Sequence, residues 1–75
     1  MKELVEYIVK SIASYPDEVK ISEEEDGGRI VIRLEVAEDD KGKVIGRQGR
    51  VARSIRLLLQ VAAVKQGTRA VLHII

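Results

Sequence analysis

Apolar residues recur at steps of one, three and four along residues 2–14, which is the spacing of one face of an α-helix. The residues that share this face are Leu4, Val5, Ile8, Val9, Ile12 and Ala13. We therefore predict a helix over residues 2–14. Pro16 should end it, because the residue before a proline is disfavoured in helical geometry.

The next two stretches alternate between apolar and polar positions, as a strand with one buried face does. The first begins near Val19 and predicts a short strand over residues 18–25. The second runs from Arg29 to Ala37, and its apolar face is Ile30, Ile32, Leu34 and Val36. Asp26-Gly27-Gly28 lies between them and is typical of a hairpin turn, so the two strands should be antiparallel neighbours.

The pattern then returns to helical spacing, interrupted by glycines. Asp39 or Asp40 can cap a short helix over Lys41–Ile45, because a carboxylate accepts hydrogen bonds from the first N–H groups of a helix. Gly46 should end that helix, and a longer one follows over residues 50–66. Its predicted buried stripe is Val51, Ile55, Leu58, Leu59, Ala62 and Ala63.

Gly67 is typical of a helix C-terminus, and residues 69–75 predict a last strand rich in β-branched residues. The order of elements is therefore α-β-β-α-α-β. The two-helix connection is long enough for the last strand to lie parallel to the second. We predict one α+β domain over residues 1–75, in which three helices cover one face of a three-stranded mixed sheet.

The charges divide the chain at Lys41. Residues 1–40 carry all twelve acidic side chains and five basic ones, a net charge of −7. Residues 41–75 carry eight basic side chains and no acid, a net charge of +8. This asymmetry favours a nucleic acid or another anionic partner. The alternative is that the two halves neutralise each other in the fold, and the totals do not decide between these readings.

Composition narrows the class of protein. The chain has no cysteine, which excludes disulfides and thiol nucleophiles and fits a cytoplasmic location. No apolar run approaches the ~20 residues of a membrane helix, and the N-terminal residues do not resemble a signal peptide. A chain of 75 residues builds a small core, so we expect an oligomer.

Gly46-Arg47-Gln48-Gly49 is the stretch that most strongly indicates a function. Two glycines at this spacing are common by chance, so the argument rests on their place between two helices in an acid-free region. Glycines let a phosphodiester chain approach the backbone closely, and loop N–H groups favour its negative charge. We expect Arg47 and Gln48 to be exposed, with Lys43, Arg50 and Arg53 reaching adjacent phosphates. A plain helix–turn–helix corner with solvated basic residues is the alternative.

Other chemistries fit poorly. No Gly-Lys-Ser/Thr follows Gly46, which excludes a P-loop, and no dinucleotide fingerprint follows a strand. The chain has no Phe or Trp to stack bases on a sheet. His73, the single histidine, lies in an aliphatic strand with no acid nearby in sequence. We therefore predict no enzyme activity, no cofactor, no metal site and no small-molecule substrate.

The element order and the run Lys43-Val-Ile-Gly-Arg-Gln-Gly-Arg-Val-Ala-Arg-Ser-Ile-Arg56 resemble a type II KH domain. Over essentially all 75 residues the chain is similar to the KhpA family of bacterial stand-alone KH proteins. The resemblance implies a cleft for about four unpaired nucleotides, whose backbone the G-x-x-G loop clamps. It places Gly46, Arg47, Gln48 and Gly49 on phosphates. The implied apolar floor is Val44, Ile45, Ala52 and Ile55, with Ile32 or Leu34 or their neighbours on the far wall. The alternative is that Val44, Ile45 and Ile55 are core residues, which for Ile55 is the favoured reading.

The resemblance also implies how the protein acts. We expect binding of single-stranded RNA, and a dimer with itself or with a larger KH-containing protein. We further expect RNA-chaperone or post-transcriptional activity, linked to cell shape and division. The alternative function is a protein–protein assembly domain that acts mainly through dimerisation, in which the basic half meets an acidic protein.

Overall fold

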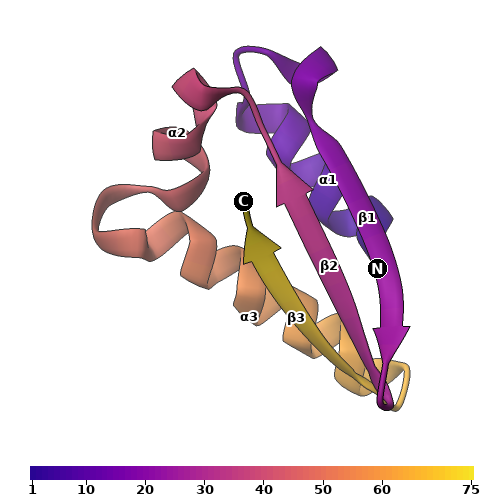
Figure 1. Cartoon of the computed structure of the whole chain (residues 1–75). Coiled ribbons are helices and arrows are strands. Elements are labelled where there is room, and N and C mark those ends of the chain that lie inside the picture. The colour runs from indigo at the N-terminus through magenta and orange to yellow at the C-terminus, as the bar shows by residue number, and fades with distance from the viewer.

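The computed structural model describes all residues 1–75 and has the predicted order of elements. The helices are α1 (Lys2–Ile12), α2 (Lys41–Ile45) and α3 (Arg50–Lys65), and the strands are β1 (Lys20–Asp26), β2 (Arg29–Glu35) and β3 (Arg69–Ile74). One-turn 3-10 segments lie at Pro16–Glu18, Glu38–Asp40 and Arg47–Gly49. Figure 1 shows the sheet as one layer, with the helices on one side of it and the α2–α3 loop protruding.

The sheet has the order β1-β2-β3. β1 pairs antiparallel with β2 through the Gly27-Gly28 turn, and β2 pairs parallel with β3. Both pairings confirm the prediction. Because β2 is central, β1 and β3 are the two edges, and α3 runs beside β3 (Figure 1). The register brings Arg29 level with Asp26 on one side and with Arg69 on the other.

The core lies between the sheet and the helices. Ile32 and Leu34 of β2 are fully buried against Val5 and Val9 of α1 and Leu59 of α3. This confirms the predicted apolar face of β2. The Schellman pattern ends α3, with the Thr68 N–H donating to the Ala63 carbonyl at 2.9 Å and the Gly67 N–H to the Val64 carbonyl at 3.0 Å.

The predicted stripe of α3 needs a correction. The buried residues are Ala52, Ile55, Leu59 and Ala63, whereas Leu58 is 51% exposed. Ile55, Leu59 and Ala63 are buried as predicted and Val51 packs against the core, but α3 carries more apolar residues than its buried face accommodates. The surplus forms an exposed apolar surface, here called the α3 ridge, made of Leu57, Leu58, Val61 and Val64.

The predicted cap of α2 is also wrong in its detail. Asp40 occupies the N-cap position, but its side chain makes no hydrogen bond to the first N–H groups of α2. Its carboxylate accepts instead from the backbone N–H groups of Ser14 and Tyr15, each at 2.9 Å. Asp40 is the one buried charged or polar residue, and it ties the segment after α1 to the start of α2. None of the helices has both the length and the apolar character needed to cross a bilayer.

Candidate nucleic-acid interface

Helix α2 fixes the base of the G-x-x-G loop. Val44 is fully buried in the core, which decides between its two readings, cleft floor and core, in favour of the core. Ile45, the next residue, is 41% exposed beside the loop. Lys43 is half-exposed and donates to the Ser14 hydroxyl, with its ammonium 3.8 Å from the Asp40 carboxylate. The short helix is therefore held by the burial of Val44 and by the contacts of Lys43 with Ser14 and Asp40.

The backbone of the loop requires glycine at its first position. Gly46 has φ 76° and ψ 171°, a conformation that side chains rarely adopt. A Cβ on Gly46 would lie 2.8 Å from the Val51 Cβ and 2.9 Å from the Val51 nitrogen. Gly49 is left-handed as well, at φ 74° and ψ 15°, but a Cβ there would meet only the Arg53 Nη2 at 3.8 Å, an ordinary van der Waals contact. The first glycine is thus needed for close packing on α3, and the second for backbone conformation.

Gln48 sits at the tip of the loop in a left-handed conformation, with φ 58° and ψ 25°. Arg53, one turn into α3, donates to the Gln48 carbonyl, and Arg50 donates to the Gln48 side-chain oxygen at 3.3 Å. The Gly49 N–H donates to the Gly46 carbonyl at 3.1 Å and closes the turn. Two of the arginines expected on phosphates therefore also brace the loop, while Arg47 is exposed without such a bond.

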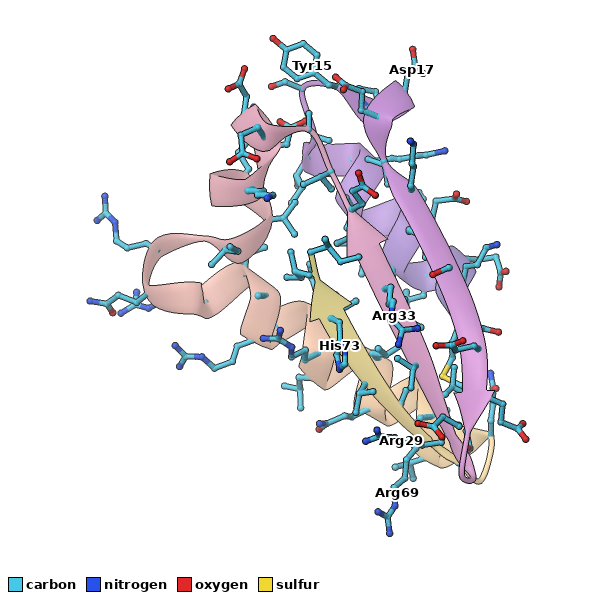
Figure 2. All side chains as sticks on the ribbon, viewed as in Figure 1. Tyr15, Asp17, Arg29, Arg33, Arg69 and His73 are labelled. Carbon is cyan, nitrogen blue, oxygen red and sulfur yellow. The ribbon has the colours of Figure 1, made fainter.

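Most of the basic side chains in residues 41–75 have no acidic partner. Lys41 and Lys43 pair with acids three residues earlier, Glu38 and Asp40. The other basic side chains of the second half form no salt bridge in the structure; they are Arg47, Arg50, Arg53, Arg56, Lys65 and Arg69. Two of the eight basic side chains pair with acids of the first half and six do not, which favours the reading with an anionic partner. Figure 2 shows nitrogen-tipped side chains projecting from the loop and the start of α3 into solvent.

A groove runs from these arginines along α3, and β3 forms its opposite wall in the middle and far sections. Three adjoining hollows make it, and Gln60 lines all three. The hollow beside the loop also contains Arg50, Arg53, Ser54, Arg56 and Leu57, and the middle one contains Arg56, Ala70, Val71, Leu72 and His73. Arg56 crosses the groove floor and donates through Nε and Nη2 to the Leu72 carbonyl, both at 3.4 Å.

The far wall expected from the resemblance is corrected by this geometry. Ile32 and Leu34 are fully buried beneath the helices, and the wall is formed by β3 instead. Ala52 and Ile55 are also buried, so they lie under the groove rather than in it. Sequence reasoning missed Gln60 and His73 as lining residues. A signal for Gln60 was present, because Arg53, Arg56 and Gln60 follow the three- and four-residue steps of one helix face.

The family model of the KhpA/KhpB KH domain matches residues 2–74 of this chain. The chain belongs to this KH-domain family. It is 49% identical to the RNA-binding protein KhpA of Clostridium acetobutylicum over 75 residues, with all of both chains covered. It is 48% identical to the KhpA of Halalkalibacterium halodurans, covering 100% of this chain and 99% of that one. It is 45% identical to the KhpA of Borreliella burgdorferi, covering 97% and 89%.

Solved structures show the same fold. Era in complex with a GTP analogue and a segment of 16S ribosomal RNA superposes with a TM-score of 0.63 at 19% identity. Era of Aquifex aeolicus bound to GDP and aluminium fluoride gives 0.62 at 19% identity. Each comparison covers 97% of this chain and 28% of the other. The likeness confirms the predicted type II KH arrangement as a fold.

Proposed function

We propose that this KH domain is a single-stranded RNA-binding protein whose G-x-x-G loop grips the phosphate backbone. The observation that carries the proposal is an unpaired group of arginines around a glycine loop, placed at one end of a groove. The second half of the chain has no acid that could neutralise these arginines. A phosphodiester chain supplies the missing negative charge. The KhpA relatives are themselves named RNA-binding proteins.

Each exposed residue of the site has a distinct part in this proposal. Gly46 and Gly49 let the backbone of the RNA approach, and Arg47 and Gln48 meet its phosphates. Arg50 and Arg53 stabilise the loop and add positive charge behind it. Ile45 offers apolar surface to a base, and Lys43 adds a phosphate contact at the rim while it remains close to Asp40.

The groove suits an unpaired strand better than a duplex. Its walls are a helix and a strand edge, and its lining mixes apolar side chains with cations. Bases splayed from a single strand can pack on such a lining, whereas a duplex hides its bases. Few side chains are placed to read base edges, so broad sequence tolerance follows. We extend the proposal to a cytoplasmic RNA chaperone or post-transcriptional regulator that affects cell shape and division, without catalysis.

The test is the double substitution Arg47→Asp with Gln48→Asp. Gel shifts are run with single-stranded RNA, duplex RNA and single-stranded DNA. The wild-type protein should bind the single-stranded RNA, and the variant should not. Lys65→Asp with Gln66→Asp is a matched control, since it makes the same charge change at the exposed far end of α3. If the folded loop variant binds as tightly as wild type, the loop does not bind RNA.

A second function, assembly, has its own supporting observation. The α3 ridge leaves Leu57, Val61 and Val64 exposed by 62%, 51% and 75%, at steps of four and three residues. This is the spacing by which one helix packs along another. We propose that in the RNA-free protein a second copy of this chain pairs with the ridge, which shares Leu57 and Val64 with the groove, and that a larger KH-containing protein is the competing partner. Light scattering on wild type and Val61→Glu should show a dimer only for wild type.

A further inference from the structure

The groove is longer than a clamp for about four nucleotides requires. Beyond His73 it continues into a third hollow between the C-terminal part of α3 and the first residues of β2 and β3. The apolar residues that line this hollow are Ala63, Val64, Ala70 and Val71. Arg29 and Arg69 line it as well. Along α3, Val64 lies about 21 Å from Arg50, at 1.5 Å of rise per residue.

Arg29 and Arg69 are direct neighbours across the parallel β2–β3 pair, each as the first residue of its strand. Figure 2 shows both side chains together at the end of the sheet opposite the G-x-x-G loop. Like charges placed opposite each other on adjacent strands destabilise a sheet unless something compensates them. The only acid within reach is Asp26, 3.6 Å from Arg29, and Arg69 has no acidic partner. One net positive charge is therefore left beside an apolar hollow.

The backbone holds this pair in place. The Thr68 hydroxyl donates to the Gly28 carbonyl at 3.3 Å, which joins the turn before β3 to the turn before β2. Both arginines follow these joined turns directly, so the spacing between their backbones is set by the sheet and by this bond. Two guanidinium groups that extend from neighbouring backbone positions are well suited to a phosphate, which guanidinium binds through two parallel hydrogen bonds.

We propose that Arg29 and Arg69 form a second phosphate-binding site, which holds the part of a single-stranded RNA that extends past the G-x-x-G clamp. The occupant is the same RNA strand, because Gln60 lines all three hollows and Ala70 and Val71 line both the middle and the third. The nucleotide next to that phosphate packs on Val64 and Val71. The protein thus has a footprint longer than four nucleotides, anchored at both ends of α3. This inference rests on the proposed RNA-binding function.

The experiment compares labelled oligouridines of four and about eight nucleotides by fluorescence anisotropy, over a series of salt concentrations. Arg69→Ala should weaken binding of the longer RNA several-fold and leave the four-nucleotide RNA unchanged. It should also reduce the slope of log affinity against log salt by about 0.7 for the longer RNA, the value for one phosphate contact on a single strand. Arg69→Lys should restore the slope, since it keeps the charge.

Lys65→Ala is the matched control, because Lys65 is exposed, unpaired and outside the groove. An equal effect of Lys65→Ala would reduce the Arg69 result to general charge and overturn the site. Equal losses for both RNA lengths in Arg69→Ala would overturn it too, since Arg69 would then belong to the four-nucleotide clamp. An Arg69→Ala protein with wild-type affinity and slope refutes this site alone, provided the loop double variant still loses binding. Failure of wild type to bind either RNA refutes the proposed function itself.

Discussion

The Asp40 carboxylate, fully buried, accepts the backbone N–H of Ser14 through Oδ1 at 2.9 Å. Twenty-six residues separate the two, so the bond joins the segment after α1 to the residue at the start of α2. Tyr15 donates to the second carboxylate oxygen, and Lys43 approaches from α2. The G-x-x-G loop follows α2 directly. The position of the loop therefore depends on a charge buried on the opposite side of the short helix.

This arrangement makes stability depend on pH. The Ser14 N–H, more than any other group, holds the pKa of Asp40 below the usual aspartate range, with help from Tyr15 and Lys43, while burial acts in the opposite direction. The unfolded chain then takes up this proton at a higher pH than the folded one. The stabilisation is present above the ordinary aspartate pKa near 4 and is lost as pH falls through the lower, folded value.

Asp40→Asn should lower the melting temperature clearly at pH 6, because its amide NH₂ would face one of the two N–H donors. The gap to wild type should shrink as the pH falls from 5 towards 2.5, since wild type then loses the charge as well. Thermal unfolding by circular dichroism measures both. Asp39→Asn is the control, because Asp39 is exposed and forms no salt bridge. A gap that stays constant across this range would contradict the role given to the charge.

Alanine at the two loop glycines should have unequal effects. Gly46→Ala forces a side chain into contact with Val51 and into a backbone region reserved for glycine, so we expect a loss of about 1–3 kcal/mol in the free energy of unfolding. Gly49→Ala meets no clash, since its Cβ would lie 3.8 Å from the Arg53 Nη2, and should lose only about 1 kcal/mol from its left-handed backbone. Urea denaturation gives both values.

The comparison has an internal control in Gly42→Ala. Gly42 lies within α2 with no atom near its missing Cβ, so alanine there should be neutral or stabilising by up to about 1 kcal/mol. RNA affinity should fall for Gly46→Ala and stay near wild type for Gly42→Ala. Equal losses for Gly46→Ala and Gly49→Ala would show that the contact with Val51 has no part in shaping the loop.

Arg47 and Arg53 should respond differently to lysine. Arg47 forms no salt bridge and is proposed to act through its charge, so Arg47→Lys should keep RNA affinity within about twofold. Arg53 also holds the Gln48 carbonyl with its guanidinium, and the shorter reach and different geometry of lysine do not reproduce that bond. Arg53→Lys should weaken binding by roughly three- to tenfold, or about 0.7–1.4 kcal/mol. Anisotropy titrations check this, and equal behaviour of the two variants would contradict the bracing role of Arg53.

Sequence patterns predicted the elements and the topology because these depend on local spacing. The alternation in residues 29–37, the turn at Gly27-Gly28 and the glycines around the loop each act over a few residues. The patterns failed where the answer depends on long-range contacts. Local spacing predicts that Asp39 or Asp40 caps α2, whereas the bonds of Asp40 to Ser14 and Tyr15 cross the fold. Leu58 was assigned to the core because α3 is apolar on more than one face.

The groove could be predicted only in part for the same reason. Lys43 to Arg53 are contiguous in sequence, so a loop site could be read from them. The opposite wall comes from β3, which lies beside α3 only in the folded protein. Ile32 and Leu34, the residues expected on that wall, are buried. The hollow that holds both Arg29 and Arg69 joins positions forty residues apart, which no local pattern connects.

Pairing through the α3 ridge should respond to salt in the direction opposite to RNA binding. α3 contains four basic side chains and no acid, so two copies that pack ridge to ridge bring like charges together. Raising the salt from about 0.05 to 0.5 M screens this repulsion and should tighten the dimer, while RNA affinity falls as phosphate contacts weaken. Sedimentation equilibrium of the RNA-free protein measures the first, and Val64→Ser, an exposed ridge position, should weaken the dimer at both salt concentrations. A dimer that weakens with salt would instead indicate that the acidic edge of β1, from Glu23 to Asp26, docks on the basic face of a second copy.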